Sequence, residues 1–540
     1  MKEADVAAAL VQEAQAREVW GRELMATVAA SSGQTFTHFM RQRARSWDDR
    51  PALTFEHRTW TYRELWDAID RARHTLADRG VAPGNSVGLW LNNSDLYVIW
   101  YLAVLGLGAV AVPLNNRFVA REAAYVLEHS QAVLLLSEAE FEPLIAKLKT
   151  EHSIEVPLLL LRTDDPFGHM SATAWHQEVK VQAQSPAALY YTSGTTGQPK
   201  GVIHTHPGLI ADALQSAMAW QCTFEGAKAL AITPLFHIAF HTIFLPVFFF
   251  GGSVVVSTYD THSTLRAIDS DDITVFFGVP SILLLMVDKA KALGMTLAKV
   301  KTVMFGAAPM TISKLGEVQA LFPQAALIHG MGQTESGGTL VTLPGFASAA
   351  RAGSVGIALP AVEVAIFDEH DQVVPRGSVG ELVARGPNVM LGYFRNPSAT
   401  AQTLRNGWLH TGDLGYQTEE GLVYLVDRKK DMIIRGGENI YSSEVEQVLL
   451  RHPAVKSAAV VGQRDTLFGE QVAAFIVPDP QGPELSAEQL SEHCKRELAD
   501  YKVPVTFVFR TEMPLTATGK IKKNELRDSL PAYSRSASSS

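Results

Sequence analysis

Strand and helix periodicities alternate along the first two thirds of the chain. Residues 51–58, PALTFEHR, predict a strand, and residues 61–80, TYRELWDAIDRARHTLADRG, predict a helix. Thr61 and Glu64 have the spacing of a capping box, in which two side chains satisfy backbone amides at the helix start. Gly80 suits the helix C-terminus. The predicted apolar face consists of Leu65, Ala68, Ile69, Ala72 and Leu76, which recur at helical spacing.

This alternation continues to about residue 360. Residues 85–91, NSVGLWL, predict a buried strand, and residues 96–114 predict a buried helix that passes into a strand. Strands that alternate with helices indicate an α/β fold, with mostly parallel sheets flanked by helices on both faces. The length of 540 residues suggests three or four domain-sized units.

The pattern changes twice in the last third of the chain. From about residue 361 to 427, short strand patterns alternate with glycine-rich turns. This stretch therefore predicts a small β unit. After it, a strand, a Gly-Gly turn, a helix capped by Ser443 with Glu446, and further strands predict a smaller α+β domain. We therefore expect an N-terminal domain at 1–429, a C-terminal domain at 430–535 and a disordered tail at 536–540.

Composition narrows the class of protein. The net charge of −9 argues against a nucleic-acid-binding surface. Cys222 and Cys494 form neither a disulfide framework nor a CxxC metal site, and each is interpreted as a small buried apolar residue. The most apolar run, residues 243–256, is too short to cross a membrane and contains Pro246. We expect a cytoplasmic protein without an integral membrane segment, and a homodimer stays open.

The stretch YYTSGTTGQPKG, residues 190–201, is the first candidate for chemistry. It differs from a Walker loop, because Pro199 stands where that loop requires glycine before the lysine. Hydroxyl groups, glycines that allow close backbone approach, and a mobile positive charge could bind phosphate. Taken alone, the stretch fits a phosphate loop and a flexible surface turn equally well. The residues concerned are Thr192, Ser193, Gly194, Thr195, Thr196, Gly197 and Lys200.

Six further segments decide between these two interpretations. TSGTTGQPKG resembles the phosphate loop of the adenylate-forming superfamily, which includes acyl-CoA synthetases, firefly luciferase and peptide-synthetase adenylation domains. The superfamily's other motifs follow in order, so the resemblance covers roughly residues 35–530. They are PLFH at 234–237, FGAAP at 305–309, GMGQTE at 330–335, GWLHTGDLG at 407–415, DRKKDMIIRGGENIYSSEVE at 427–446 and PLTATGKIKKNEL at 514–526.

The resemblance implies an AMP-forming acyl-CoA synthetase that uses ATP, Mg²⁺ and coenzyme A. A carboxylic acid would attack the α-phosphate of ATP, pyrophosphate would leave, and coenzyme A would then displace AMP. The loop and Lys200 would hold the β- and γ-phosphates. Thr334 would donate to the α-phosphate, and Glu335 would ligate Mg²⁺. A lone solvated glutamate is the alternative for Glu335.

Further contacts with the nucleotide follow from the same resemblance. Asp413 would accept hydrogen bonds from the ribose hydroxyls, and Arg428 would contact ribose or phosphate, with a structural salt bridge as its alternative. Met331 stands where the superfamily usually has an aromatic residue that stacks on adenine, and its thioether would cover the ring instead. The adenine site would otherwise consist of Gly306, Ala307, Ala308, Pro309 and Gly332.

The C-terminal motifs imply a rotating domain. Lys520 would bridge the attacking carboxylate and the α-phosphate, although Lys522 and Lys523 nearby leave an ordinary surface lysine as the alternative. Lys430 matches the hinge position of the superfamily. After rotation, Gly436 and Gly437 would leave room for the pantetheine arm of coenzyme A, whereas a tight turn alone would also explain two glycines.

The PLFH segment and its neighbours bear on the acyl group of the substrate. Residues 234–244 contain no acid that could meet an ammonium group, so an amino-acid substrate is not favoured. His237 would lie beside the carboxylate, and His241 is either a polar substrate contact or a core histidine. A medium-chain, alicyclic or aromatic monocarboxylate fits best. The predicted acyl pocket consists of His237, Phe240, His241, Phe277, Gly306, Gly330, Met331 and Gly338.

Three other functions stay open at this stage. An acyl-AMP ligase that loads a carrier protein would share every motif but would not release AMP on addition of coenzyme A. Luciferase-like oxidation would emit light in the presence of oxygen. A nucleotide-binding protein without turnover would not need Lys520, Glu335 and Asp413 together.

Overall fold

Alternating strands and helices, as predicted, make up most of the computed structural model of the protein. The structure describes residues 3–192, 198–306, 310, 312–480, 482–515 and 521–533. Two units are formed: unit 1 contains residues 1–364, 384–410 and 420–422, and unit 2 contains residues 365–383, 411–419 and 423–540. The domain boundary at 429/430 stays a prediction.

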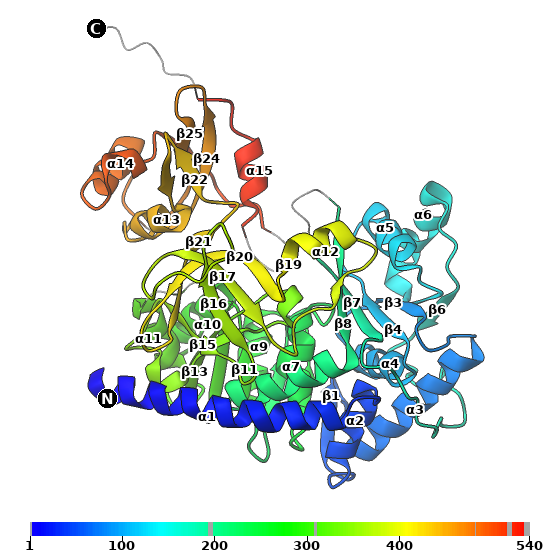
Figure 1. The fold of residues 1–540 in the computed structure, drawn as a ribbon. Helices are drawn as coiled ribbons and strands as arrows, with labels where there is room; N and C mark the ends of the chain where they lie inside the picture. Colours follow the sequence, from blue (N-terminus) through cyan, green and yellow to red (C-terminus); the bar gives the residue numbers. More distant parts are fainter. Residues whose placement is uncertain are drawn as a thin grey trace, which may run out of the picture. The chain divides into compact units, whose positions relative to one another are not determined.

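The first sheet of unit 1 has seven strands (Figure 1). The pairs from β7 to β6 are parallel, and the pairs β7–β8 and β8–β18 are antiparallel. The parallel majority agrees with the prediction for this part of the chain. In spatial order the strands are β18 (Gly392–Tyr393), β8 (Lys200–Thr205), β7 (Pro186–Thr192), β4 (Val110–Pro113), β3 (Ser86–Trp90), β5 (Leu134–Glu138) and β6 (Leu158–Leu161).

The second sheet of unit 1 is also mainly parallel. From β13 through β12, β11, β9 and β10 to β1 every neighbouring pair is parallel, and β14, β15 and β2 are added antiparallel. The strands in spatial order are β15 (Ser354–Ala358), β14 (Val341–Leu343), β13 (Ala326–Met331), β12 (Thr302–Gly306), β11 (Val275–Phe277), β9 (Lys228–Ala231), β10 (Ser253–Val256), β1 (Pro51–Phe55) and β2 (Arg58–Thr61).

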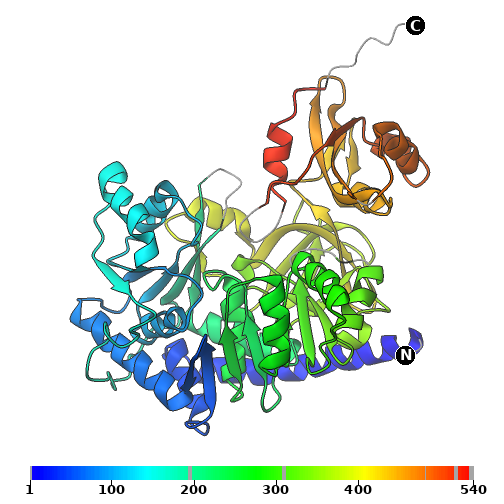
Figure 2. The same cartoon turned by 180° about the vertical axis from the view of Figure 1, so that it is seen from behind.

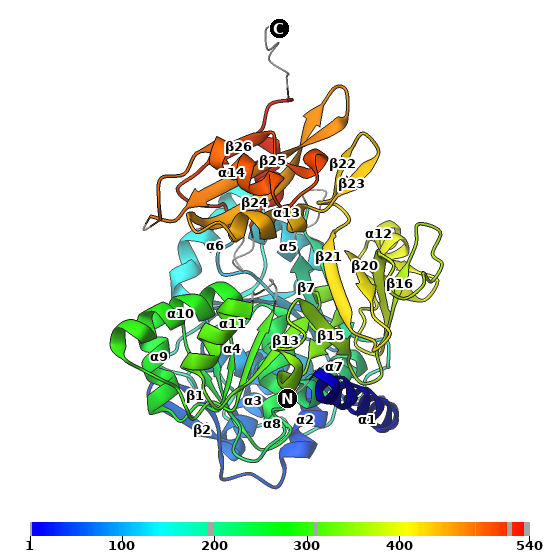
Figure 3. The same ribbon diagram turned by 90° about the vertical axis from the view of Figure 1, so that its left-hand side faces the viewer.

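Helices cover both faces of these sheets. Figures 2 and 3 show α9 (Thr261–Ser270), α10 (Pro280–Leu293) and α11 (Ile312–Leu321) against one face of the second sheet, where they bury a common apolar core. The largest core lies between the two sheets and contains α3 (Tyr62–Asp78), α4 (Asp95–Gly106) and α7 (His206–Ala219). α5 (Ala120–Ser130) and α6 (Glu142–His152) pack on the outer face of the first sheet.

The start of α3 forms as the sequence predicts, and the strand before it is shorter than predicted. Thr61 and Glu64 form the capping box, all of the predicted apolar face is buried, and Gly80 has a φ of +80° just beyond the helix end. The strand predicted for residues 51–58 forms as β1 but ends at Phe55. The chain reverses at Glu56, which has a positive φ of 51°, and β2 returns antiparallel to β1.

Helix α1 (Glu3–Ala30) was not anticipated from the sequence. It packs against α7, and its Arg17 is 4% exposed beside Glu13, with Nε 2.9 Å from the Glu13 carboxylate. The Arg17 guanidinium also donates to the carbonyls of Ile357 and Ala358 and to the hydroxyl of Thr342. The buried face of α1 thus contains an arginine. An apolar residue at this position would have made the face recognisable from the sequence pattern.

Unit 2 includes a five-stranded sheet with three helices. The sequence predicts four of these strands and misses β23 (Glu438–Ile440), which pairs with β22 after the Gly-Gly turn. The remaining elements are β22 (Ile433–Arg435), β25 (Gly469–Pro478), β24 (Val455–Asp465), β26 (Thr506–Phe509), α13 (Ser442–Leu450), α14 (Ala487–Lys495) and α15 (Lys523–Asp528).

The predicted cap of α13 is wrong. Ser443 donates to the carbonyl of Val426 instead of accepting a helix amide. Glu446 accepts from the amide of Val460 and pairs with Lys523 at 2.7 Å. A cation from a distant part of unit 2 therefore competes successfully for the carboxylate that the local pattern assigns to the cap.

Both cysteines are buried, as predicted. Burial raises the pKa of Cys222 to about 12 and that of Cys494 to about 11, so neither thiol is an activated nucleophile. No helix in the described ranges has the length and apolar content needed to cross a membrane.

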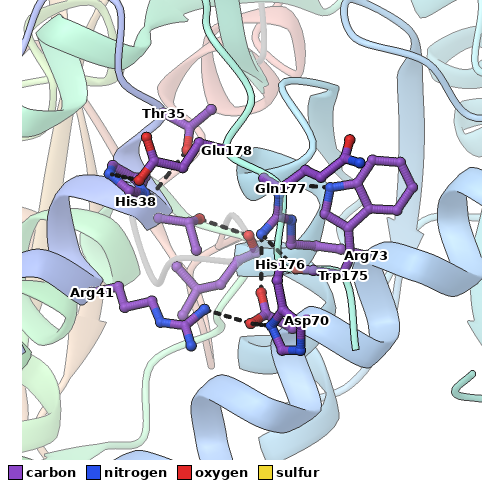
Figure 4. Close-up of polar contacts among 11 residues, drawn as sticks. Thr35, His38, Arg41, Asp70, Arg73, Trp175, His176, Gln177 and Glu178 are labelled. Carbon is purple, nitrogen blue, oxygen red and sulfur yellow. Dashed lines mark hydrogen bonds and ion pairs between the residues drawn. The ribbon is translucent and has the colours of Figure 1, made fainter. Parts of the chain in front are cut away.

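A strap formed by residues 175–178 is held against α2 (Phe36–Ala44) and α3 (Figure 4). The contact centres on the carboxylate of Asp70 on α3. This carboxylate forms ion pairs with Arg41 of α2 and, at 2.9 Å, with Arg73 of α3. The backbone carbonyl of Asp70 accepts from the Trp175 amide, and Arg73 donates to the Gln177 carbonyl. The side chain of Asp70 is 3% exposed and that of Arg73 9%, so this pair is shielded from solvent.

We expect Asp70→Asn to lower the free energy of unfolding of unit 1 by about 3 kcal/mol, because Arg73 would stay buried without its counter-charge. Denaturant unfolding followed by tryptophan fluorescence measures the loss, and hydrogen exchange should show faster opening of residues 171–178. Asp67→Asn on the same helix is the control, because its side chain is 56% exposed. Equal effects of the two substitutions would contradict this account.

Candidate active site

The predicted site segments of unit 1 lie at the carboxyl ends of neighbouring parallel strands. PLFH follows β9, Phe277 ends β11, Gly306 ends β12 and Met331 ends β13. Gly306 is directly opposite Gly330 in the pairing of β12 with β13, and Phe277 is opposite Met304 one strand further along. Ligands of parallel α/β sheets bind at this edge. The structure therefore brings these segments together where binding is expected.

Backbone segments approach so closely here that side chains would collide. A Cβ on Gly332 would lie 2.4 Å from the carbonyl oxygen of Gly338, and one on Gly330 would lie 2.1 Å from the ring of Trp220. Gly338 also has a φ of +117°. Close packing thus accounts for these glycines, whatever ligand contacts Gly330, Gly332 and Gly338 make.

Thr334 and Glu335 form one turn of 3₁₀ helix with Ser336, directly after β13. Nε2 of His204, on β8 of the other sheet, lies 2.8 Å from the carbonyl oxygen of Thr334. Burial lowers the pKa of His204 to about 4, so its ring is neutral and Nε2 carries the hydrogen for this bond. The amide of Met390 donates to the Glu335 carbonyl at 2.9 Å. Both sheets therefore fix the backbone of the turn.

The Glu335 carboxylate has a direct partner in Tyr393. The Tyr393 hydroxyl donates to Oε1 of Glu335 at 2.8 Å, and burial raises the pKa of Tyr393. Lys200 Nζ lies 4.8 Å from the centre of the Tyr393 ring. A carboxylate can accept about four hydrogen bonds or ligand contacts, so this arrangement fits a glutamate that also binds a divalent cation.

Several predicted residues lie outside the described part of the chain. They are Ser193, Gly194, Thr195, Thr196, Gly197, Ala307, Ala308, Pro309 and Lys520. On either side of the loop, Thr192 ends β7 and is paired with Lys200, which begins β8. The roles of this group stay predictions.

Of the eight residues predicted for the acyl pocket, His237, Phe240 and His241 lie in and just before the π-helix Phe240–Phe244, and their surroundings differ. His237 is half-buried, and its Nδ1 accepts from the amide of Ala239 at 3.2 Å. Phe240 is fully buried, with edge contacts to the rings of Tyr97 and Tyr101.

His241 is buried among protein groups. Its Nε2 lies 3.0 Å from the Leu209 carbonyl and its Nδ1 3.5 Å from the Tyr101 hydroxyl. Burial lowers its pKa to about 3, so the ring is neutral. Because both ring nitrogens have partners inside the fold, we leave His241 out of the proposed substrate contacts.

The predicted ribose residues lie together in unit 2. Asp413 on β20 (Trp408–Gln417) faces Arg428 on β21 (Val423–Arg428), and Nε of Arg428 is 3.0 Å from the Asp413 carboxylate. Both the ion pair and the ribose contact thus remain compatible with the geometry. Lys430 follows in an exposed turn between β21 and β22.

Gly436 and Gly437 form the two-residue turn of the hairpin β22–β23, with φ values of 60° and 90°. Positive φ at both central positions is the geometry of a type I′ turn. The turn requires these glycines on conformational grounds alone, and room for a pantetheine arm stays a prediction.

The sequence gives no separate signal for three of the residues that organise this site. His204, Asn388 and Tyr393 come from β8, from the segment before β18 and from β18 itself. Asn388 donates to the carbonyls of Ser336 and Thr339 at 2.7 and 3.1 Å. Each becomes recognisable only when the two sheets are placed side by side.

Comparison with protein families agrees with this geometry. The family described as AMP-binding enzyme matches residues 40–394, and its C-terminal domain matches residues 444–520. The chain belongs to the AMP-binding enzyme family. The predicted membership of the adenylate-forming superfamily is thereby confirmed, and with it the class of AMP-forming acid–CoA ligase that uses ATP, Mg²⁺ and coenzyme A.

Curated relatives match this chain over most of its length. A 2-succinylbenzoate–CoA ligase of Bacillus subtilis is 34% identical, covering 91% of this chain and 97% of the relative. A feruloyl-CoA synthase of Amycolatopsis is 33% identical, covering 89% and 98%. A fatty acid–[acyl-carrier-protein] ligase of Streptomyces coeruleorubidus is 34% identical, covering 88% and 93%.

Solved structures show the same α/β fold with a smaller C-terminal domain. The o-succinylbenzoate CoA synthetase of Bacillus subtilis in complex with its acyl-adenylate intermediate has a TM-score of 0.81 and 32% identity, covering 93% of this chain and all of that one. The same synthetase in complex with ATP and magnesium ion has a TM-score of 0.81 and 33% identity, covering 91% and 99%.

We expect Tyr393→Phe to lower acid-dependent pyrophosphate release about tenfold and to raise the Mg²⁺ concentration needed for half-maximal rate, because Glu335 loses the donor that orients it. Initial rates at varied Mg²⁺ measure both effects. Tyr416→Phe, on β20, is the control and should leave the rate unchanged. A Tyr393→Phe enzyme with an unaltered Mg²⁺ requirement would contradict this role.

Proposed function

We propose that this chain activates an apolar monocarboxylic acid as acyl-AMP, with release of pyrophosphate, and transfers the acyl group to coenzyme A. The acid is a medium-chain fatty, alicyclic or aromatic acid. The observation that carries the proposal is the Thr334–Glu335 turn with Tyr393 and Lys200, at the same strand ends as the apolar side chains of Phe277 and Met331.

In this proposal the triphosphate is held by the loop that ends at Lys200. Lys200 and the loop hydroxyls bind the β- and γ-phosphates until pyrophosphate leaves, and Thr334 donates to the α-phosphate. Glu335, oriented by Tyr393, holds Mg²⁺, which neutralises phosphate charge when it is bound. Asp413 binds the ribose hydroxyls with Arg428 beside it.

Adenine is assigned to the ends of β12 and β13. Gly306, Met331 and Gly332 form its site together with residues 307–309, and Met331, at 9% exposure, offers a thioether in place of an aromatic ring. Such a contact is softer and less directional than ring stacking.

The acyl group lies on the opposite side of the α-phosphate from the pyrophosphate, because the carboxylate attacks in line. His237 is placed beside the carboxylate, and Phe240, Phe277, Gly330, Met331 and Gly338 surround the acyl chain. The relatives named for 2-succinylbenzoate and feruloyl-CoA favour an aromatic acid, and the relative named for a fatty acid supports an aliphatic one.

Adenylation and attack by the thiol need different groups in the same space, which explains why the proposed C-terminal domain at 430–535 would rotate between the two steps. Lys520 bridges the carboxylate and the α-phosphate during adenylation, where charge develops. The thiol of coenzyme A needs that space afterwards. Rotation about Lys430 removes Lys520 and brings the Gly436–Gly437 turn towards the thiol.

An acid panel tests the proposed activity. We expect AMP formation that requires both an acid and coenzyme A, with benzoates tried first, then cyclohexanecarboxylate, then fatty acids from short to long. AMP release that requires a phosphopantetheinyl carrier protein and not coenzyme A would support the carrier-loading alternative. Absence of pyrophosphate release with every acid would favour a nucleotide-binding protein without turnover.

We expect Lys520→Ala to reduce acid-dependent pyrophosphate release at least about 100-fold, since Lys520 stabilises charge only in that transition state. Thioester formation from supplied acyl-adenylate and coenzyme A should stay within about threefold of wild type, because that step occurs without Lys520. Lys522→Ala is the matched control, two residues away. Equal loss of both half-reactions in Lys520→Ala would contradict the two-step assignment.

A further inference from the structure

Helix α7 carries a buried carboxyl group for which the proposed chemistry has no role. Asp212 is 1% exposed, and no ion pair involves it within the described ranges. Its Oδ2 lies 3.0 Å from Oγ1 of Thr242, and its Oδ1 has no hydrogen-bond partner among the residues described. A charged carboxylate in such a place would be costly.

The hydrogen bonds of Thr242 indicate the protonation state of Asp212. Besides Asp212 Oδ2, the Thr242 hydroxyl contacts the carbonyl oxygens of Gly337 at 2.5 Å and Ile238 at 3.1 Å. One hydroxyl hydrogen cannot serve three acceptors. If Thr242 donates to its nearest neighbour, Gly337, then the contact with Asp212 is favourable only when Asp212 carries a hydrogen and donates it.

The surroundings of Asp212 agree with a neutral acid. Two titratable groups interact electrostatically with Asp212, namely Tyr101 on α4 and Tyr190 on β7. Their hydroxyls lie 2.8 Å apart, and the His241 ring lies beside the Tyr101 hydroxyl. None of the three is a cation here. Burial raises the pKa of Asp212 well above its usual value.

Thr242 joins two segments of the proposed acyl site. It lies in the π-helix Phe240–Phe244, shortly after His237, and a Cβ on Gly338 would come within 2.3 Å of its Oγ1. The bond from Thr242 to the Gly337 carbonyl therefore holds Gly337 and Gly338 against the π-helix. Gly338 is the proposed acyl contact that follows the Thr334–Glu335 turn.

We propose that Asp212 is a neutral carboxylic acid whose hydrogen bond to Thr242 positions Gly337 and Gly338 at the acyl side of the active site. Asp212 is a positioning residue and touches no reacting atom. Its effect on the acyl group rests on the proposed function, whereas its protonation state does not.

This role predicts that disturbing the Thr242 bond changes the KM for the acid and not the KM for ATP. The Thr334–Glu335 turn is held separately, by His204, Met390 and Tyr393. Loss of the Thr242 hydroxyl should therefore loosen Gly338 while the turn that serves the nucleotide keeps its other bonds.

The first test uses kinetics of the full chain. Thr242→Val, similar in shape without the hydroxyl, should raise the KM for the acid about tenfold and leave the KM for ATP within about twofold. Thr242→Ser keeps the hydroxyl and should restore the acid KM to within about threefold of wild type. Asp212→Asn, whose amide can donate to Thr242 as the protonated acid does, should also stay within about threefold.

The proposal would be overturned if Thr242→Val raised the KM values for the acid and for ATP together. It would also be overturned if the acid KM of Asp212→Asn were as high as that of Thr242→Val. Failure of the near-isosteric Asp212→Asn to fold would do the same, because it would show that the negative charge is needed.

The second test does not depend on activity. The infrared difference spectrum between wild type and Asp212→Asn at neutral pH should contain the carbonyl stretch of a protonated carboxylic acid. Carboxylate bands in its place would overturn the proposal. If no acid in the panel is activated, the proposed function fails, and this spectrum still decides the protonation of Asp212.

Discussion

The hydrogen bond from Tyr393 to Glu335 joins the two sheets of unit 1 at the place where the proposed chemistry occurs. Glu335 follows β13 of the second sheet, and Tyr393 lies on the edge strand β18 of the first. His204 of β8 makes a second connection to the carbonyl of Thr334. A site that holds ATP and an acid together must fix anions at short distances, and rigid elements do this better than loops. The rest of the site is arranged around this junction, since Lys200 lies at the Tyr393 ring and the glycine contacts lie at the start of the same turn.

Local sequence patterns predicted the elements whose structure depends on local interactions. The capping box of Thr61, the face of α3 and the parallel sheets follow from spacing and periodicity. The motifs predicted the family for the same reason, because their glycines and hydroxyl residues are contiguous. Two predictions failed because a distant residue decided the outcome. Lys523 takes the carboxylate of Glu446 from the predicted cap, and Arg17 replaces the apolar residues that would have marked the buried side of α1.

The partners of the candidate site belong to this second kind. His204, Asn388 and Tyr393 have no motif of their own, because each acts through a contact that exists only after the two sheets pack. Asp212 is a further example. Residues 234–244 contain no acid, yet α7 brings the Asp212 carboxyl to Thr242 inside that segment. A neutral Asp212 offers no counter-charge to an ammonium group, so the interpretation that the substrate is not an amino acid is unchanged.

The central claim is that the acid's carboxylate attacks the α-phosphate of ATP. Transfer of a heavy oxygen isotope from a labelled carboxylic acid tests it most directly, with the products of one complete turnover analysed by mass spectrometry. The account predicts one labelled oxygen in the phosphate of AMP and none in pyrophosphate, because cleavage of acyl-AMP leaves one carboxylate oxygen on the α-phosphorus. Label in pyrophosphate or orthophosphate, or unlabelled AMP, would contradict it.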